Sequence, residues 1–251
     1  MANYAYRDKE RKHIILASKA LEEDRHKSFY CPNPLCNSKL FICAVDGSRK
    51  AHFRATKSTY KHIANCPYAN SSIVFDDNKF NQSNFSFENA MQNLLVKNNS
   101  KSAMSASKSS SCEEHTNYTL RTIKQIYSMC KQFPPNYSYG NEKIGRMILD
   151  DRTAYCYPKG VFGLKIIESC VKGRFYDNDK NEIYLVAPIA NPNYHFILSI
   201  PDINLYRKIR NMVFENKDKF IIVAGEWKLS DFRHDYFKTT IYNKKQIAIL
   251  N

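Results

Sequence analysis

Glycine is scarce in this chain of 251 residues, which contains only seven, and tryptophan occurs once. Loops that cradle phosphate need several glycines at fixed spacing, and no such run is present, which argues against nucleotide hydrolysis. No apolar run approaches the roughly 20 residues that a membrane-spanning helix needs. The first residues, MANYAYRDKERK, also lack the apolar core of a signal peptide. We therefore expect a cytoplasmic protein.

Acidic residues are few relative to basic ones, with 24 Asp and Glu against 38 Lys and Arg and a formal net charge of +14. Residues 1–70 hold half of this excess, with 13 basic and 6 acidic side chains. Such a surplus favours a polyanionic partner. No basic amphipathic helix with a clean apolar face points to a membrane surface. We expect nucleic acid as the partner and no membrane, and charge that serves only solubility is the alternative.

Eight cysteines in a chain without an export signal favour metal binding or burial over a disulfide framework. Cys31-x4-Cys36 and His62-x3-Cys66 form two short pairs separated by 25 residues, which predicts four ligands around one ion. Thiolates with an imidazole select zinc, and a shell of four protein ligands leaves no position for a catalytic water. The prediction is a structural zinc site.

Two residues between these pairs leave the ligand set open. His52 could replace His62, which we favour, and Cys43 could replace a cysteine, although packing explains it better. Thiols that are buried without any metal are the remaining alternative.

The segments YCPNPLCNSKLFIC and RKAHFRATKSTYKHIANCPYA resemble the N-terminal zinc-finger region of the competence protein CoiA and its relatives. The resemblance covers roughly the first 70 residues and implies a zinc module in a protein that handles nucleic acid. The first pair is spaced by four residues instead of two, and Ala55 stands where a second histidine often follows the HF pair. No counterpart of the CoiA nuclease region is present.

The remaining chain divides by composition. Residues 12–21 predict a strand or hairpin before the cysteines, and residues 87–96 predict a short helix. Residues 97–117 are rich in Ser, Lys and Asn and predict a flexible linker. The predicted units are a zinc module at 1–70, a short helix with the linker at 71–117, a helix within 118–140, and a C-terminal domain at 141–251.

The C-terminal domain reads as three strands, a helix near 204–214, and two more strands, which is the order of an OB-fold. The predicted fold class is α+β, mostly β: a small zinc-finger module and a five-stranded OB-like barrel with one helix, joined by the linker. Gly160, Gly163 and Gly173 suit the bends of a small barrel. Tyr194, Phe196, Leu198 and Ile200 share one strand face and are expected in the core.

OB-folds bind single strands through basic grooves and exposed aromatic rings. The predicted contacts are the basic and aromatic residues of this domain: Lys172, Arg174, Tyr176, Tyr184, His195, Trp227, Lys228, Lys244 and Lys245. Core packing is the alternative for each aromatic ring, and Trp227 suits either location. The lysines could equally be solvated surface charges.

Glu226 and Lys228 follow the spacing of metal-dependent nucleases, which also need an aspartate. Asp150, Asp151, Asp177 and Asp202 are all available, none is uniquely placed, and such triplets arise often by chance. Cys112 and His115 lie in the linker, which cannot hold a nucleophile and base in register. We therefore predict a non-enzymatic, zinc-containing protein that prefers single-stranded DNA or RNA. The alternatives are a protein-interaction adaptor in phage defence or a mobile element, and a nuclease.

Overall fold

The computed structural model describes residues 2–47, 50–56, 58–64, 66–69, 75, 80–96, 119–188, 193–231 and 233–250. These residues form a mixed α+β structure made mostly of strands, which confirms that part of the predicted fold class. The predicted linker at 97–117, with Cys112 and His115, lies outside the described residues. Within the described ranges, no helix has the length and apolar character to cross a membrane.

The N-terminal unit is an antiparallel sheet with strand order β2-β1-β3-β4-β5. The strands are β1 (Tyr4–Tyr6), β2 (Ile14–Leu16), β3 (Phe29–Tyr30), β4 (Lys39–Cys43) and β5 (His52–Arg54). Its core is held by the rings of Phe29 and Phe53, whose centroids lie 5.0 Å apart edge to face. The strand expected in residues 12–21 is limited to β2, because the chain turns at once into a 3-10 helix at Ala17–Lys19.

Two helices cover one part of the C-terminal sheet, the face of strands β9 (Gly163–Ser169) and β13 (Ile221–Leu229). Helix α1 (Phe87–Leu95) begins at Ser86, whose hydroxyl accepts a hydrogen bond from the amide of Asn89, as expected for an N-cap. Helix α2 (Ile123–Gln132) begins with a capping box at Thr122 and ends before the two prolines. Their buried faces share one apolar core with β9 and β13. A hairpin of β6 (Ser138–Tyr139) and β7 (Glu142–Lys143) and a single turn, α3 (Ile144–Met147), then lead to β8 (Ile148–Leu149).

The C-terminal sheet has the strand order β10-β11-β12-β14-β13-β9-β8, and β15 pairs with β13. Its elements are β9 (Gly163–Ser169), β10 (Tyr176–Asp177), β11 (Glu182–Val186), β12 (His195–Ser199), α4 (Ile203–Glu215), β13 (Ile221–Leu229), β14 (Tyr236–Thr240) and β15 (Ile247–Ile249). The pairs β12–β14 and β8–β9 are parallel, and the others are antiparallel. The predicted order of three strands, a helix and two strands is present, with short additional strands. An isolated bridge between Cys170 and Val186 links the end of β9 to β11.

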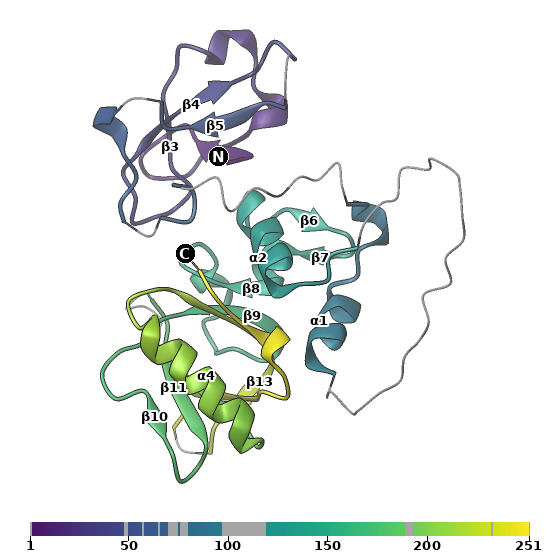
Figure 1. Cartoon of the computed structure of the whole chain (residues 1–251). Helices are drawn as coiled ribbons and strands as arrows, with labels where there is room; N and C mark the ends of the chain where they lie inside the picture. The colour runs from purple at the N-terminus through teal and green to yellow at the C-terminus, as the bar shows by residue number, and fades with distance from the viewer. Residues whose placement is uncertain are drawn as a thin grey trace, which may run out of the picture.

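One face of this sheet encloses a core that the sequence largely predicted. Tyr194, Phe196, Leu198 and Ile200 are all buried there, and α4 adds three apolar side chains of its own. Gly160 adopts φ +113°, and a Cβ at this position would collide with the ring of a core phenylalanine. In Figure 1 the N-terminal sheet lies beyond one end of α2, and α4 lies on the C-terminal sheet.

Candidate metal centre and sheet groove

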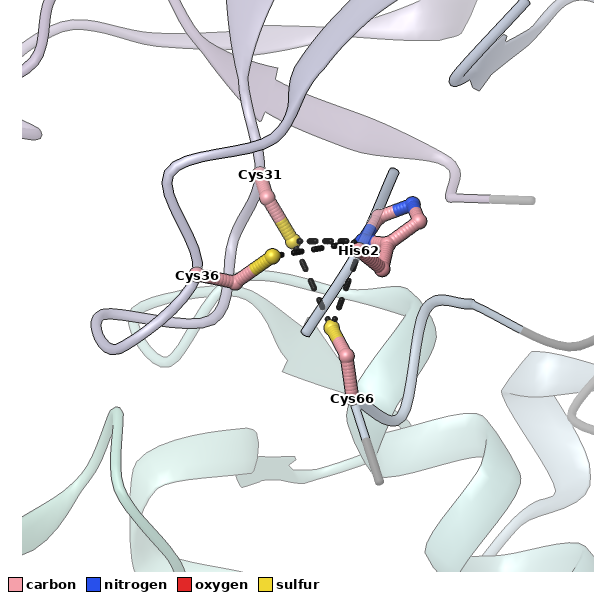
Figure 2. Close-up of side chains that lie close together, drawn as sticks. All are labelled: Cys31, Cys36, His62 and Cys66. Carbon is pink, nitrogen blue, oxygen red and sulfur yellow. Dashed lines mark hydrogen bonds between the residues drawn. The ribbon is translucent and has the colours of Figure 1, made fainter. Parts of the chain in front are cut away.

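Three thiols and one imidazole converge in the N-terminal unit (Figure 2). The ligand atoms of Cys31, Cys36, His62 and Cys66 all lie within 4.8 Å of one another, so the group could hold a metal ion. The sulfurs of Cys31 and Cys66 are 3.7 Å apart, and His62 Nδ1 lies 3.3–3.5 Å from the three sulfurs. Tetrahedral zinc bonds would place two sulfurs roughly 3.8 Å apart and sulfur and nitrogen roughly 3.6 Å apart. The donor set and its spacing are therefore compatible with zinc.

The two alternative ligands lie elsewhere. His52 and Cys43 are cross-strand partners on β5 and β4, and His52 Nδ1 is 3.0 Å from the carbonyl oxygen of Lys50. Neither residue belongs to the one candidate metal group among the described residues. The structure therefore supports His62 as the fourth member of the cluster.

Arg11 holds the first cysteine pair from outside the ligand set. Its guanidinium donates hydrogen bonds to the carbonyl oxygens of Cys31 at 3.2 Å, Asn33 at 3.0 Å and Cys36 at 2.8 Å. Its backbone has φ +56°, a conformation that residues other than glycine adopt only rarely. The sequence contains no signal for this contact, because Arg11 lies 20 residues before Cys31 and outside any ligand spacing.

The surroundings of the cluster lower the pKa of one thiol, Cys36, and raise the pKa of the other two, Cys31 and Cys66. Hydrogen bonds from the thiols of Cys31 and Cys66 lower the pKa of Cys36, whereas burial raises the pKa of Cys31. Cysteine binds a metal as the thiolate, so binding of an ion displaces the remaining thiol protons.

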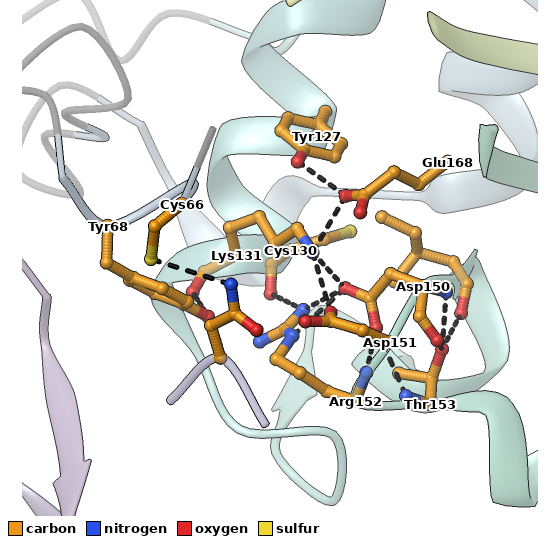
Figure 3. Close-up of polar contacts among 12 residues, drawn as sticks. Cys66, Tyr68, Tyr127, Cys130, Lys131, Asp150, Asp151, Arg152, Thr153 and Glu168 are labelled. Atoms are coloured by element: carbon orange, nitrogen blue, oxygen red, sulfur yellow. Dashed lines mark hydrogen bonds and ion pairs between the residues drawn. The ribbon is translucent and has the colours of Figure 1, made fainter. Parts of the chain in front are cut away.

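The metal centre is joined directly to the rest of the protein (Figure 3). Tyr68, two residues after Cys66, donates a hydrogen bond to the carbonyl oxygen of Lys131 at 3.0 Å. Its hydroxyl is 3.3 Å from that of Tyr4, which accepts a hydrogen bond from Arg152 at 2.8 Å. The N-terminal sheet is therefore fixed to the end of α2 and to the turn after β8.

A buried ion network lies behind this contact. Lys131, 1% exposed, is 2.7 Å from a carboxylate oxygen of Asp150 and 2.8 Å from one of Glu168. Arg152 pairs with the same oxygen of Asp150 at 2.8 Å. Burial alone would raise the pKa of Asp150, but these two cations hold it below its ordinary value. Asp150, one of the four aspartates considered for a nuclease, is thus engaged in internal pairs.

A groove of about 1370 Å³ follows the outer face of β11, β12 and β14. Strand register sets the side chains in rows across these three strands. Tyr184, Ile197 and Lys238 form one row, which Lys228 of β13 extends. Val186, His195 and Tyr236 form the next row, and Glu182, Ser199 and Thr240 form the third.

Five of the nine predicted nucleic-acid contacts line this groove: Lys172, Arg174, Tyr184, His195 and Lys228. Tyr176 is not among the lining residues and lies under the guanidinium of Arg210 at 5.6 Å. Lys244 and Lys245 line a separate pocket beside α1 and the start of α2.

Trp227 requires a correction. The side chain is in the core with only 2% of the residue exposed, and its indole N–H donates to the carbonyl oxygen of Lys165 at 3.2 Å. A base cannot stack on a ring in this position. The alternation along β13 explains the difference, because Glu226 and Lys228 point outward and the residue between them points inward.

The sequence missed two residues that complete the groove. Tyr236 stacks on His195 with ring centroids 4.4 Å apart and planes 5° apart, and Lys238 lies on the same face as the cross-strand partner of Ile197. The parallel pairing of β12 with β14 creates both neighbours, and a single sequence does not reveal that pairing. Comparison of the chain with protein-family models, curated proteins and solved structures finds no match. Function is therefore inferred from the residues and their geometry.

Proposed function

We propose that this protein binds single-stranded nucleic acid in the sheet groove and does not catalyse a reaction. The observation that carries the proposal is the convergence of aromatic rings and cations on one open face. Tyr184 and His195 offer rings on which bases can stack, each stack contributing about 1–3 kcal/mol. The ring of Tyr236 is itself stacked on His195, has the Arg233 guanidinium 5.5 Å from its centroid, and so supports the imidazole. Lysine and arginine side chains along the groove supply phosphate contacts.

The placement of like charges supports an anionic ligand. Lys228 and Lys238 are direct cross-strand partners, and like charges in this position destabilise a sheet. Lys238 is compensated by Glu182 at 2.6 Å. Lys228 has no such ion pair with a described acidic residue, and a phosphate in the groove would supply the missing countercharge.

We also propose that the C-terminal strands form an OB-type barrel. Residues 163–177 would act as one bent first strand, since β9 pairs with β13 and β10 pairs with β11. The bridge between Cys170 and Val186 lies at the bend between β9 and β10. The groove then covers the second, third and fifth strands, and the second and third strands form the face that OB-folds use for oligonucleotides.

We propose that the N-terminal cluster holds structural zinc in a CoiA-like module. The support is the thiolate and imidazole donor set, its tetrahedral spacing and the order of the CP and HF segments. Zinc would supply folding free energy and no chemistry. Removal of the metal by a chelator should then unfold residues 2–69 while leaving the C-terminal sheet folded, as followed by residue-resolved hydrogen exchange.

Fluorescence anisotropy with labelled oligonucleotides tests the binding proposal. Single strands should bind more tightly than duplex of the same length, and affinity should fall steeply between low and moderate salt. Absence of binding at low salt would refute the proposal. Cleavage that needs a divalent metal and disappears in Glu226→Ala would instead support a nuclease.

A further inference from the structure

The groove is lined mainly by cations, which suit phosphate, but it also contains the acidic side chain of Glu182. Five cations line the groove: Lys172, Arg174, Lys180, Lys228 and Lys238. Glu182 lies among them and is only 8% exposed, so its carboxylate is part of the groove floor. Its charge is balanced by Lys238 at 2.6 Å, and its oxygens remain hydrogen-bond acceptors in a groove otherwise lined by donors to phosphate.

Both oxygens of this carboxylate are held in place. Lys238 Nζ donates to Oε1 at 2.6 Å, and the Tyr184 hydroxyl donates to Oε2 at 3.0 Å. Burial and the hydrogen bond to Glu182 raise the pKa of Tyr184, which keeps the hydroxyl a donor. Two carboxylate oxygens offer about four acceptor positions, so capacity for a further N–H donor remains after these two bonds.

The position of Tyr184 connects this acceptor to a stacked base. A base that stacks on the ring and extends past its hydroxyl brings its edge to Glu182, which is only one hydrogen bond further along the sheet. Lys238 offsets the negative charge, so the phosphates of the same strand are not driven away. An amino group on the base edge would donate to the carboxylate, whereas a carbonyl oxygen in the same place would be repelled.

We propose that Glu182 is a specificity-determining residue that selects bases with an exocyclic amino group, and cytosine over uracil or thymine. The inference rests on the proposed function of the groove. Cytosine and uracil differ on this edge at two places: the N4 amino group replaces the O4 carbonyl, and N3 is an acceptor in cytosine but carries a proton in uracil. The two homopolymers therefore compare a carboxylate that faces the group at position 4, where only cytosine has a donor. We expect the protein to bind oligo-dC about tenfold more tightly than oligo-dU of equal length, which corresponds to the lower part of the range for one base-edge contact.

The test measures both ligands by anisotropy on the full metal-loaded chain, at slightly alkaline pH where cytosine is unprotonated. Glu182→Gln keeps the shape of the side chain and can donate to O4, so the ratio should fall to about one, with oligo-dU gaining affinity. Tyr184→Phe keeps the stacking ring but removes the hydrogen bond that holds Oε2 of Glu182. It should lower the ratio of oligo-dC to oligo-dU affinity by less than Glu182→Gln does. Lys228→Gln is the matched control. Its affinity for both ligands should fall equally, and the slope of log affinity against log salt concentration should decrease by about 1, as expected for the loss of one phosphate contact.

Three outcomes separate the alternatives. Equal binding of oligo-dC and oligo-dU by the wild-type protein would overturn the inference and leave the proposed function standing. Equal weakening of both ligands by Glu182→Gln, with the ratio retained, would show that Glu182 only stabilises the sheet and would also overturn it. Absence of binding to either ligand would refute the proposed function itself. Thermal unfolding of each variant shows that the fold is retained.

Discussion

Replacement of Arg11 by alanine should weaken metal binding at the Cys31, Cys36, His62 and Cys66 centre. The substitution removes three hydrogen bonds to carbonyl oxygens in the first cysteine pair. It also removes a positive charge beside a cluster in which three thiolates would outweigh a bound divalent ion. Alanine leaves the backbone strain at φ +56° unchanged, so the effect isolates the side chain.

The expected magnitude follows from the position of the guanidinium. Hydrogen bonds to charged groups each contribute about 1.5–3 kcal/mol, but this side chain is only half-buried and water can replace part of the loss. The metal-free form also makes these contacts, so only their difference between the two forms affects affinity. Loss of such supporting contacts commonly weakens metal binding 10- to 100-fold, or about 1.4–2.7 kcal/mol, and we expect a value in this range.

Competition with a chromogenic zinc chelator measures the affinity, and absorption of the cobalt-substituted protein reports ligand geometry. Arg11→Lys should retain the charge but lose the planar set of N–H donors that reaches several carbonyl oxygens. Its affinity for zinc should lie between those of the wild type and Arg11→Ala. Arg25→Ala is the control, since Arg25 pairs only with exposed acidic residues of the same unit. An Arg11→Ala protein with the affinity of the wild type and an unchanged cobalt spectrum would refute the reasoning.

Three further predictions concern stability and the core. The hydrogen bond from Arg7 lowers the pKa of Asp24 to about 2, below the unfolded value of about 3.9, so this carboxylate stabilises the fold above pH of about 4. Asp24→Asn should therefore lower the melting temperature at neutral pH, and the difference from the wild type should vanish as the pH falls towards 2. Arg152→Met should destabilise the protein by about 3–5 kcal/mol in urea titrations, because Asp150 loses a buried partner; a loss below 1 kcal/mol would contradict this. Emission of Trp227, the single tryptophan, should be blue-shifted and insensitive to oligonucleotide but shift to the red on unfolding; strong quenching by ligand would contradict its burial.

The sequence predicted the features that depend on local spacing. The cysteine and histidine pairs, the helix that begins at Ser86 and the buried alternation from Tyr194 to Ile200 all follow from residues near one another in the chain. The order of strands and helix after residue 160 also follows from local patterns. These parts of the fold and of the candidate metal centre could therefore be predicted from the sequence.

Features that depend on contacts between distant segments were not predicted. The stack of Tyr236 on His195 needs the parallel pairing of β12 with β14, and the direction of Trp227 needs the register of β13. The pairs of Lys131 with Asp150 and Glu168 join three elements, and no charge pattern in the chain indicates them. The places of Tyr236 and Lys238 in the groove and the whole internal ion network belong to this class.

The turn that contains Cys66 and Tyr68 is part of both the metal cluster and the contact between the N-terminal sheet and α2. It is closed by a hydrogen bond from the Ala69 amide to the Cys66 carbonyl oxygen at 2.9 Å, and it carries both a metal-cluster thiol and the hydroxyl that contacts α2. An ion that orders this turn adds its binding free energy to the attachment of the N-terminal sheet. Loss of the ion should then release this attachment as the N-terminal sheet unfolds, and chelation should increase the radius of gyration in small-angle scattering. In such a chain, metal supply would govern whether the N-terminal sheet stays attached beside the C-terminal sheet.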